Sequence, residues 1–293
     1  MKRTVASLLA LAAFAVPTLS LAGRCYRAGA TPRAPFDPGM SPREYGLSYG
    51  DFGTTPTPCS FGSFGLGIVG SALLADSHSD PNLYGVLAGG VQMRLSIPFG
   101  DRFFVTGSLG LPQYIEVHNA TVIANTLTAG PLVLGAHLVI AHGDNWQIAP
   151  YVRLMTFVGT QYAIGFGVEP GISSVLTVAN RVAFHAGISL PSSSTQLNTA
   201  SDWYVTLRGS LEVAWRFMTP IEIGLGLDLS GRLTKNTLAD PNAPPRPPET
   251  LAPFAGFRFF VGSATALQIS ASALSVGADN TLVRFGLSLW SSW

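Results

Sequence analysis

From residue 61 to the end of the chain, apolar and polar residues alternate with a period of two, which is the period of a β-strand. The alternation is clearest over residues 203–217, where one face carries Trp, Val, Leu, Gly, Leu, Val, Trp and Phe. Residues 221–233 repeat the pattern, with isoleucine and leucine on one face and glycine and charged residues among those on the other. Only residues 218–220 separate the two stretches, which is the length of a tight hairpin. The pattern predicts antiparallel strands with one apolar and one polar face.

The same pattern predicts about twelve strands along the chain, joined alternately by short and longer connections. The expected strands are 61–74, 84–97, 102–117, 128–141, 145–157, 162–178, 181–190, 202–217, 221–233, 254–262, 265–277 and 282–293. The longer connections are expected around 75–83, 118–127, 158–161, 191–201, 234–253 and 278–281.

Strands of about 9–11 residues or more, with short turns at one end and longer loops at the other, are typical of outer-membrane β-barrels. Lipid cannot hydrogen-bond a free strand edge, so such a sheet has to close on itself. We therefore expect an all-β fold, a transmembrane up-and-down antiparallel β-barrel of about 10 to 14 strands over residues 61–293. The short turns are expected to be periplasmic and the longer loops extracellular.

Residues 1–22 are predicted to be a cleaved secretory signal peptide. They combine a positive start, an apolar run over residues 5–16 and small residues at 20 and 22. The apolar run is shorter than the roughly 20 residues that a spanning helix needs. The mature chain is expected to start near Gly23. Cys25 raises the alternative of a lipoprotein, but Arg24 stands where a small residue would precede a lipidated cysteine.

The composition changes the picture further. Mean hydropathy is +0.34, and 47% of residues are hydrophobic. Only 11% are charged, against about 25% in average soluble domains. Lys2 and Lys235 are the only lysines, against fifteen arginines, so no predicted strand carries a lysine. A soluble sheet normally turns lysine and glutamate to water. The net charge of +1 gives no support to nucleic-acid binding.

The last ten residues, RFGLSLWSSW, resemble the C-terminal strand of bacterial outer-membrane β-barrel proteins. In that class the strand alternates apolar residues, ends on an aromatic residue and is recognised by the barrel-assembly machinery. Ser291 departs from the pattern, because an apolar or aromatic residue is common there. The resemblance implies an assembly signal formed by Phe285, Leu287, Leu289 and Trp293.

Four tryptophans agree with a barrel: Trp146, Trp203, Trp215 and Trp293 fall on the apolar row near predicted strand ends. Aromatic girdles of outer-membrane barrels occupy such positions at the membrane interface. The alternative is a soluble β-sandwich with packed aromatic residues, which leaves the missing lysines and the terminal tryptophan unexplained.

Residues 23–60 are rich in proline and glycine and show no period, which predicts an irregular periplasmic segment. Cys25 and Cys59 bracket the segment, and the compartment is oxidising, so we expect a disulfide between them. Closing a loop of this length would contribute about 3–4 kcal/mol in the chain-entropy model. The segment is either a tether or a plug that closes the lumen from the periplasmic side.

The polar row holds most of the charged residues of the predicted strands. One interpretation is a network of ion pairs that braces a small barrel, because charges inside need partners. The other is a water-filled channel in which arginine outnumbers carboxylate and favours anions. Arg181, Glu116, Glu169, His137 and His185 belong to the same row. The predicted lumen-lining residues are Arg94, Arg153, Arg208, Glu212, Arg216, Glu222, Asp228, Arg232, Arg258 and Arg284.

No catalytic, metal or cofactor site is predicted. Asp76, His78 and Asp80 stand together in an expected loop, which reads as a solvated loop rather than a metal or protease site. His185 and Ser189 share a face but stand about 13 Å apart along a strand, too far for a direct hydrogen bond.

Three functions therefore remain: a passive channel for small solutes, a structural or surface-interaction barrel with a filled lumen, and, more remotely, an outer-membrane enzyme. About twelve strands suit either a filled or an open barrel. The expected partners are outer-membrane lipids and the barrel-assembly machinery, with no nucleic acid.

Overall fold

A computed structural model describes residues 62–75, 83–119, 123–128, 132–143, 145–158, 164–178, 181–197, 200–218, 220–233, 250–261, 265–276 and 280–292. The predicted signal peptide, the segment 23–60 with Cys25 and Cys59, the Asp76–Asp80 loop and Trp293 lie outside these residues. No helix in the described part of the chain is long and apolar enough to cross a membrane.

The described residues form one antiparallel sheet of fifteen strands. The strands are β1 (Ser63–Ala75), β2 (Leu83–Phe99), β3 (Phe103–Asn119), β4 (Ile123–Thr128), β5 (Leu132–Leu138), β6 (Ala141–His142), β7 (Trp146–Val158), β8 (Ile164–Val178), β9 (Val182–Ser189), β10 (Ser192–Leu197), β11 (Ala200–Met218), β12 (Ile221–Arg232), β13 (Thr250–Val261), β14 (Thr265–Val276) and β15 (Asn280–Ser292).

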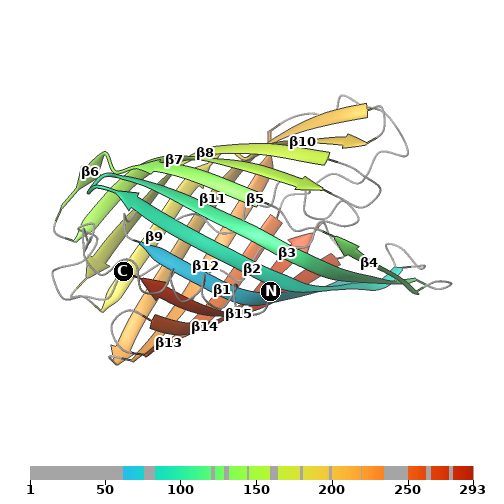
Figure 1. The fold of residues 1–293 in the computed structure, drawn as a ribbon. Helices are drawn as coiled ribbons and strands as arrows, with labels where there is room; N and C mark the ends of the chain where they lie inside the picture. Colours follow the sequence, from blue (N-terminus) through green and yellow to red (C-terminus); the bar gives the residue numbers. More distant parts are fainter. Residues whose placement is uncertain are drawn as a thin grey trace, which may run out of the picture.

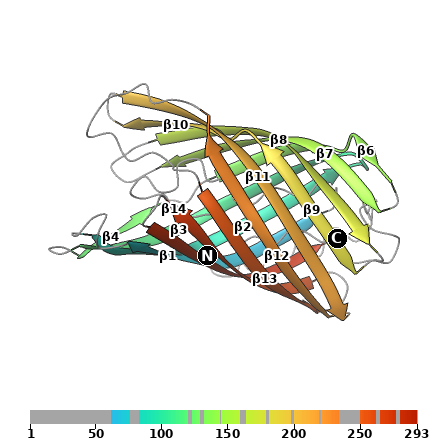
Figure 2. The same cartoon turned by 180° about the vertical axis from the view of Figure 1, so that it is seen from behind.

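The sheet closes into a barrel (Figures 1 and 2). Twelve strands form the ring in the order β1, β2, β3, β5, β7, β8, β9, β11, β12, β13, β14 and β15. The last strand pairs with the first, from Ser63 opposite Ser292 to Ala75 opposite Asn280. Closure leaves no unpaired edge in the ring, as a strand wall in lipid requires. The predicted up-and-down antiparallel barrel of about twelve strands is confirmed.

The three remaining strands prolong strands of the ring. β10 continues β9 without a change of register, because Ser189 lies opposite Arg208 and Ser192 opposite Val205. Pro191, which has no N–H to donate, interrupts the ladder between them, while its carbonyl still accepts a hydrogen bond from the Thr206 N–H at 2.9 Å. The predicted loop 191–201 is therefore wrong for residues 192–197.

The predicted connection 118–127 is also too long. β3 extends to Asn119 and pairs with β4, which begins at Ile123. In Figure 1 the β2–β3–β4 and β10–β11 regions project at the same end of the barrel. Polar residues interrupt the alternation at these strand ends, because a projecting hairpin does not need an apolar face toward lipid. The period of two therefore does not predict that these ends pair.

The described turns at the opposite end are short. The β2–β3 hairpin turns at Gly100, whose φ of +82° lies in the left-handed region that glycine adopts without strain. A Cβ at Gly100 would meet nothing within 4 Å, so backbone conformation rather than space favours glycine here.

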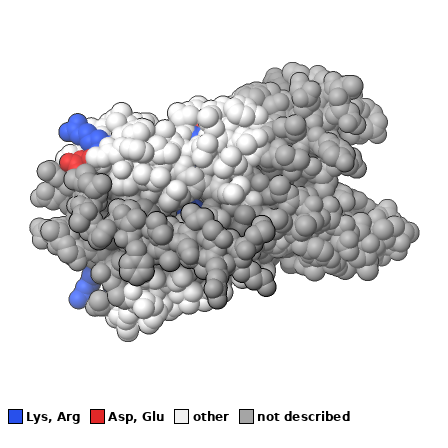
Figure 3. Space-filling view, viewed as in Figure 1, with Lys and Arg blue, Asp and Glu red and all other residues white. Residues whose placement is uncertain are grey.

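The outward rows of the wall are apolar. In β5 exposed and buried residues alternate strictly, and Leu134 is 49% exposed on the outer face. Leu211 and Leu225 reach 62%. Trp146 and Trp215 are also exposed. Figure 3 shows conspicuous charged side chains only near one end of the described surface, and the wall beside them is uncharged. The outer face therefore suits a hydrocarbon environment.

Candidate functional site

The inner wall carries the polar and charged side chains, because every second residue of each strand points inward. Of the ten predicted lumen-lining residues, nine have described side chains, and Arg232 is placed only by its pairing with Thr206 in the β11–β12 ladder. Five of the nine are buried: Arg153, Glu212, Glu222, Arg258 and Arg284. Arg181 lies in the turn before β9 and is exposed at the barrel end.

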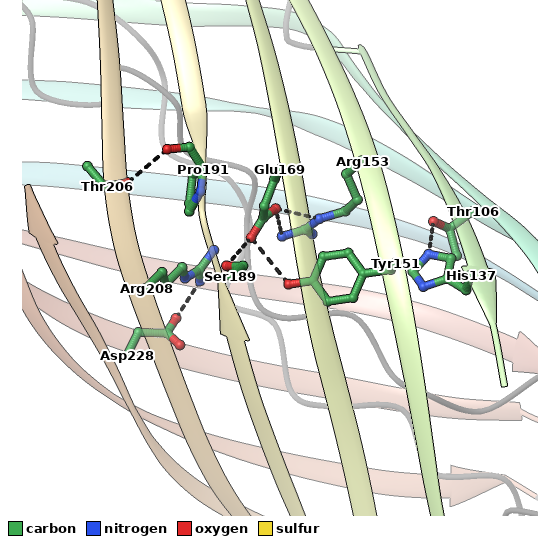
Figure 4. Close-up of polar contacts among 10 residues, drawn as sticks. All are labelled: Thr106, His137, Tyr151, Arg153, Glu169, Ser189, Pro191, Thr206, Arg208 and Asp228. Carbon is green, nitrogen blue, oxygen red and sulfur yellow. Dashed lines mark hydrogen bonds and ion pairs between the residues drawn. The ribbon is translucent and has the colours of Figure 1, made fainter. Parts of the chain in front are cut away.

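One cluster on the inner wall is centred on Glu169, which is fully buried in the middle of β8. The Arg153 guanidinium forms an ion pair with it and donates a hydrogen bond from Nε to Glu169 Oε2 at 2.7 Å. Ser189 Oγ donates to Glu169 Oε1 at 2.7 Å, and Tyr151 Oη lies 3.4 Å from the same oxygen. Figure 4 shows these groups converging on the carboxylate from β7 and β9, the two strands that flank β8. The cluster satisfies a buried charge with donors, as burial demands.

A second ion pair lies close by, on β11 and β12 (Figure 4). Arg208 Nη2 donates to Asp228 Oδ2 at 2.7 Å. The two side chains are 11% and 13% exposed, whereas the Glu169 side chain is fully buried. This pair is thus more accessible from the lumen than Glu169.

The third cluster, near the short-turn end, is built around Glu222. Arg258 Nη1 lies 2.6 Å from Glu222 Oε1, and Arg216 Nη2 lies 3.5 Å from Glu222 Oε2. Arg258 also donates to Gln268 Oε1 from Nη2 at 2.7 Å. The Glu222 side chain is 0% exposed and the Arg258 side chain is 1% exposed.

Aromatic rings close over the arginines of this third cluster. The Arg216 guanidinium carbon lies 4.2 Å from the centroid of the Phe260 ring, within cation–π range. The Arg258 guanidinium carbon lies 5.8 Å from the Trp290 centroid. Side chains therefore narrow the interior at this level.

Next to the short turns that join β2 to β3 and β5 to β7, the inner wall holds a small apolar cluster. Phe104, Val139 and Ala149 form a buried cluster. The buried His137 ring stacks on Phe104 with centroids 4.4 Å apart and an interplanar angle of 8°. His137 Nε2 lies 2.9 Å from Thr106 Oγ1 (Figure 4). His137 thus packs as part of the wall.

Two further arginines donate to neutral groups. Arg94 Nη2 donates to Gln92 Oε1 at 2.7 Å, and Arg284 Nε donates to Ser272 Oγ at 3.1 Å.

Sequence reasoning missed several partners of the charged residues. Tyr151, Gln268 and Trp290 contact the clusters, although none was among the predicted lumen residues. Ser189 was expected on the same face as His185, but its contact with Glu169 was not predicted. The signal that identifies them is their inward parity: Trp290 stands on the same side of β15 as Arg284. Trp290 also shows that the terminal segment carries one tryptophan toward the interior.

No group of three or more His, Cys, Asp or Glu that could hold a metal ion occurs among the described residues. Fixed charges, ordered by ion pairs and aromatic contacts, are the chemistry that the inner wall offers. Such a wall can repel or attract ions and hold small polar molecules.

Comparison with models of known protein families finds no match, and comparison with curated proteins finds none either. Comparison with solved structures finds outer-membrane β-barrels. An outer-membrane channel from Pseudomonas putida F1, described as COG4313, superposes with a TM-score of 0.60 and 14% identity over 87% of this chain and 100% of that chain.

Two autotransporter domains are similar as well. The translocator domain of NalP from Neisseria meningitidis gives a TM-score of 0.55 and 10% identity over 80% of this chain and 89% of that one. The transport unit of AIDA-I from Escherichia coli gives a TM-score of 0.55 and 8% identity over 79% of this chain and 90% of that chain. The resemblance to bacterial outer-membrane β-barrels is therefore confirmed at the level of the fold.

Proposed function

We propose that this chain is exported through a cleaved signal peptide, inserts into the outer membrane and acts there as a passive channel for small solutes. One observation carries the proposal: a closed barrel with an apolar outer wall bears an inner wall of charged side chains. The fold shared with an outer-membrane channel of P. putida supports it.

Anions are the solutes that the inner wall favours. Its described side chains include six arginines and four carboxylates, so the positive charges exceed the negative ones by two. In a narrow space with low-dielectric walls, this excess raises the local concentration of anions. The arginines are Arg94, Arg153, Arg208, Arg216, Arg258 and Arg284, and the carboxylates are Glu169, Glu212, Glu222 and Asp228.

Planar-bilayer recording of the purified full chain tests the channel. The expected result is a stable conductance with a reversal potential that indicates preference for chloride over potassium. Arg208→Gln and Asp228→Asn form a matched pair, because they remove opposite charges from one partly exposed ion pair. The first should lower the anion preference and the second should raise it. A cation preference of the unmodified barrel would refute the anion assignment, and absence of conductance would refute the channel.

A second candidate is a structural or surface-interaction barrel whose lumen is filled by side chains. The full burial of Glu169 and Glu222, together with the rings over Arg216 and Arg258, favours it. Such a barrel would insert normally and not conduct. We also infer that the chain has no enzymatic activity, which lipase and protease assays on the purified barrel test.

We propose outer-membrane lipids and the barrel-assembly machinery as partners. Phe285, Leu287 and Leu289 are 56%, 45% and 55% exposed on the outer face of β15, where lipid and an assembly factor can reach them.

A further inference from the structure

Carboxylates are unevenly distributed around the barrel. The consecutive strands β13, β14, β15, β1 and β2 contain no aspartate or glutamate. They contain three arginines, Arg258, Arg284 and Arg94. The four carboxylates on the described inner wall come from β8, β11 and β12. Arg258 pairs with Glu222 of the neighbouring β12, whereas Arg94 and Arg284 donate to the neutral side chains of Gln92 and Ser272, so this part of the wall carries positive charge.

Within this part of the wall, three rows of inward residues cross β15, β1 and β2 at the short-turn end. The ladder registers align them, because each β1 residue lies opposite one residue of each neighbour. We call these residues the glycine patch, since glycines occupy two of its three central positions. The rows are Ser288–Gly67–Gln92, Trp290–Gly65–Arg94 and Ser292–Ser63–Ser96.

The glycine patch places a cation and an aromatic ring on either side of Gly65, whose backbone is buried between them. A Cβ at Gly65 would lie 3.8 Å from Arg94 Cβ and 3.8 Å from Trp290 Cδ1. The side chains of Arg94 and Trp290 thus flank Gly65. Arg94 and Trp290 are both partly exposed, in contrast to the buried Arg258 and Arg284.

Hydrogen bonding orients the Arg94 side chain. Gln92, buried one row away on the same strand, accepts from Arg94 Nη2 at 2.7 Å. A guanidinium has five N–H donors in a planar fork that matches a carboxylate. The hydrogen bond from Nη2 to Gln92 restricts the rotamers of Arg94, so less conformational entropy is lost when a ligand binds. Ser288 beside Gly67, and Ser292 and Ser96 on the two sides of Ser63, add small donors and acceptors.

We propose that the glycine patch binds a small organic carboxylate with a ring-shaped body. The carboxylate contacts the Arg94 guanidinium, and the ring packs against the indole of Trp290, because these two side chains are the partly exposed ones beside Gly65. The proposal names a solute class for the proposed channel and places its binding site at the short-turn end of the lumen. Binding is defined at equilibrium, so it can be tested whether or not the barrel conducts.

The probe is benzoate, whose binding to the full chain in detergent micelles is measured by saturation-transfer NMR with empty micelles as the blank. Acetate lacks the ring and benzyl alcohol lacks the charge, so both should bind at least several-fold more weakly. Arg94→Gln should lower the affinity for benzoate about tenfold or more, the range expected for losing a charge-assisted hydrogen bond.

The matched control is Arg284→Gln. It removes the same charge from the same carboxylate-free strands, but Arg284 lies opposite Ser71, six residues along β1 from Gly65, or about 20 Å. The affinity of the Arg284→Gln variant for benzoate should stay within about twofold of the affinity of the unmodified chain, because charges are screened over this distance. Equal losses in the two variants would overturn the site, because they would indicate a diffuse potential. Equal binding of benzoate and benzyl alcohol would overturn it as well.

A second variant keeps the test independent of charge. Gly65→Leu places a side chain between Arg94 and Trp290 and should abolish benzoate binding while the heat-modifiable gel shift reports a folded barrel. Unchanged binding in that variant would also overturn the proposal. A barrel that binds benzoate in this pattern and does not conduct would refute the channel and leave the site standing.

Discussion

Replacing Glu222 with glutamine tests whether water reaches the ion pairs inside this barrel, through the change in the free energy of unfolding. The Glu222 side chain is 0% exposed and lies between two guanidinium groups. Its Oε1 is 2.6 Å from Arg258 Nη1, and its Oε2 is 3.5 Å from Arg216 Nη2. The substitution keeps the shape of the side chain and changes the net charge of these three groups from +1 to +2. Breaking a buried ion pair by neutralising one partner typically destabilises a protein by about 3–5 kcal/mol, because a charge is left without compensation. A solvated pair is worth only about 0–1 kcal/mol.

The assay is equilibrium unfolding in urea with phospholipid vesicles, followed by tryptophan fluorescence and by gel mobility. We expect Glu222→Gln to lower the free energy of unfolding by about 3–5 kcal/mol. The double variant with Arg258→Gln should recover part of this loss, because it removes one of the two repelling cations. Asp228→Asn is the control in the Arg208 pair, whose side chains are 11% and 13% exposed, and should cost less than Glu222→Gln. If Glu222→Gln cost no more than Asp228→Asn, water would reach the Glu222 cluster, and the reasoning from burial would be refuted.

Three further predictions concern the wall and its assembly. Gly171→Leu should destabilise the barrel by about 1–3 kcal/mol, because a Cβ at position 171 would lie 2.6 Å from the hydroxyl oxygen of Tyr151, which contacts Glu169. Gly209→Ala should be nearly neutral in the same unfolding assay, because a Cβ at position 209 would meet no atom within 4 Å. Leu211→Arg, on the outer face in the middle of β11, should cost about 2–4 kcal/mol in vesicles, whereas Leu233→Arg just beyond β12 should cost about 0–1 kcal/mol; equal costs would contradict a lipid-facing belt. Deleting Trp293 should reduce insertion in cells, measured as the heat-modifiable outer-membrane fraction, without changing the stability of barrels already folded by much; normal insertion would remove the assembly role.

The strand pattern was largely predictable from the sequence, because a membrane barrel imposes a strict rule on each residue. One face of a strand meets lipid and the other meets the interior, so the period of two survives over whole strands such as β11 and β13. The rule weakens where strands project at the end bearing β4 and β10. There the sequence SSSTQL of β10 has no apolar row, and only its pairing with β8 and β11 reveals a strand.

The candidate site was less predictable. Parity alone indicates that Arg153, Glu169 and Glu222 face inward. Whether two inward residues touch depends on ladder register and barrel curvature. Arg153 meets Glu169 because it lies opposite it in the β7–β8 ladder, and Glu222 meets Arg258 across the β12–β13 ladder in the same way.

The sequence by itself determined that this chain forms strands with one apolar and one polar face, and that the sheet closes into a barrel. Those properties follow from local alternation and from the inability of lipid to hydrogen-bond a strand edge. The tertiary structure alone decided which inner residues share a level of the lumen. It buried Glu169 and Glu222 among donors and rings, and it set Arg94 and Trp290 on either side of Gly65. These are contacts between strands, and their geometry depends on register, which alternation along one strand does not contain.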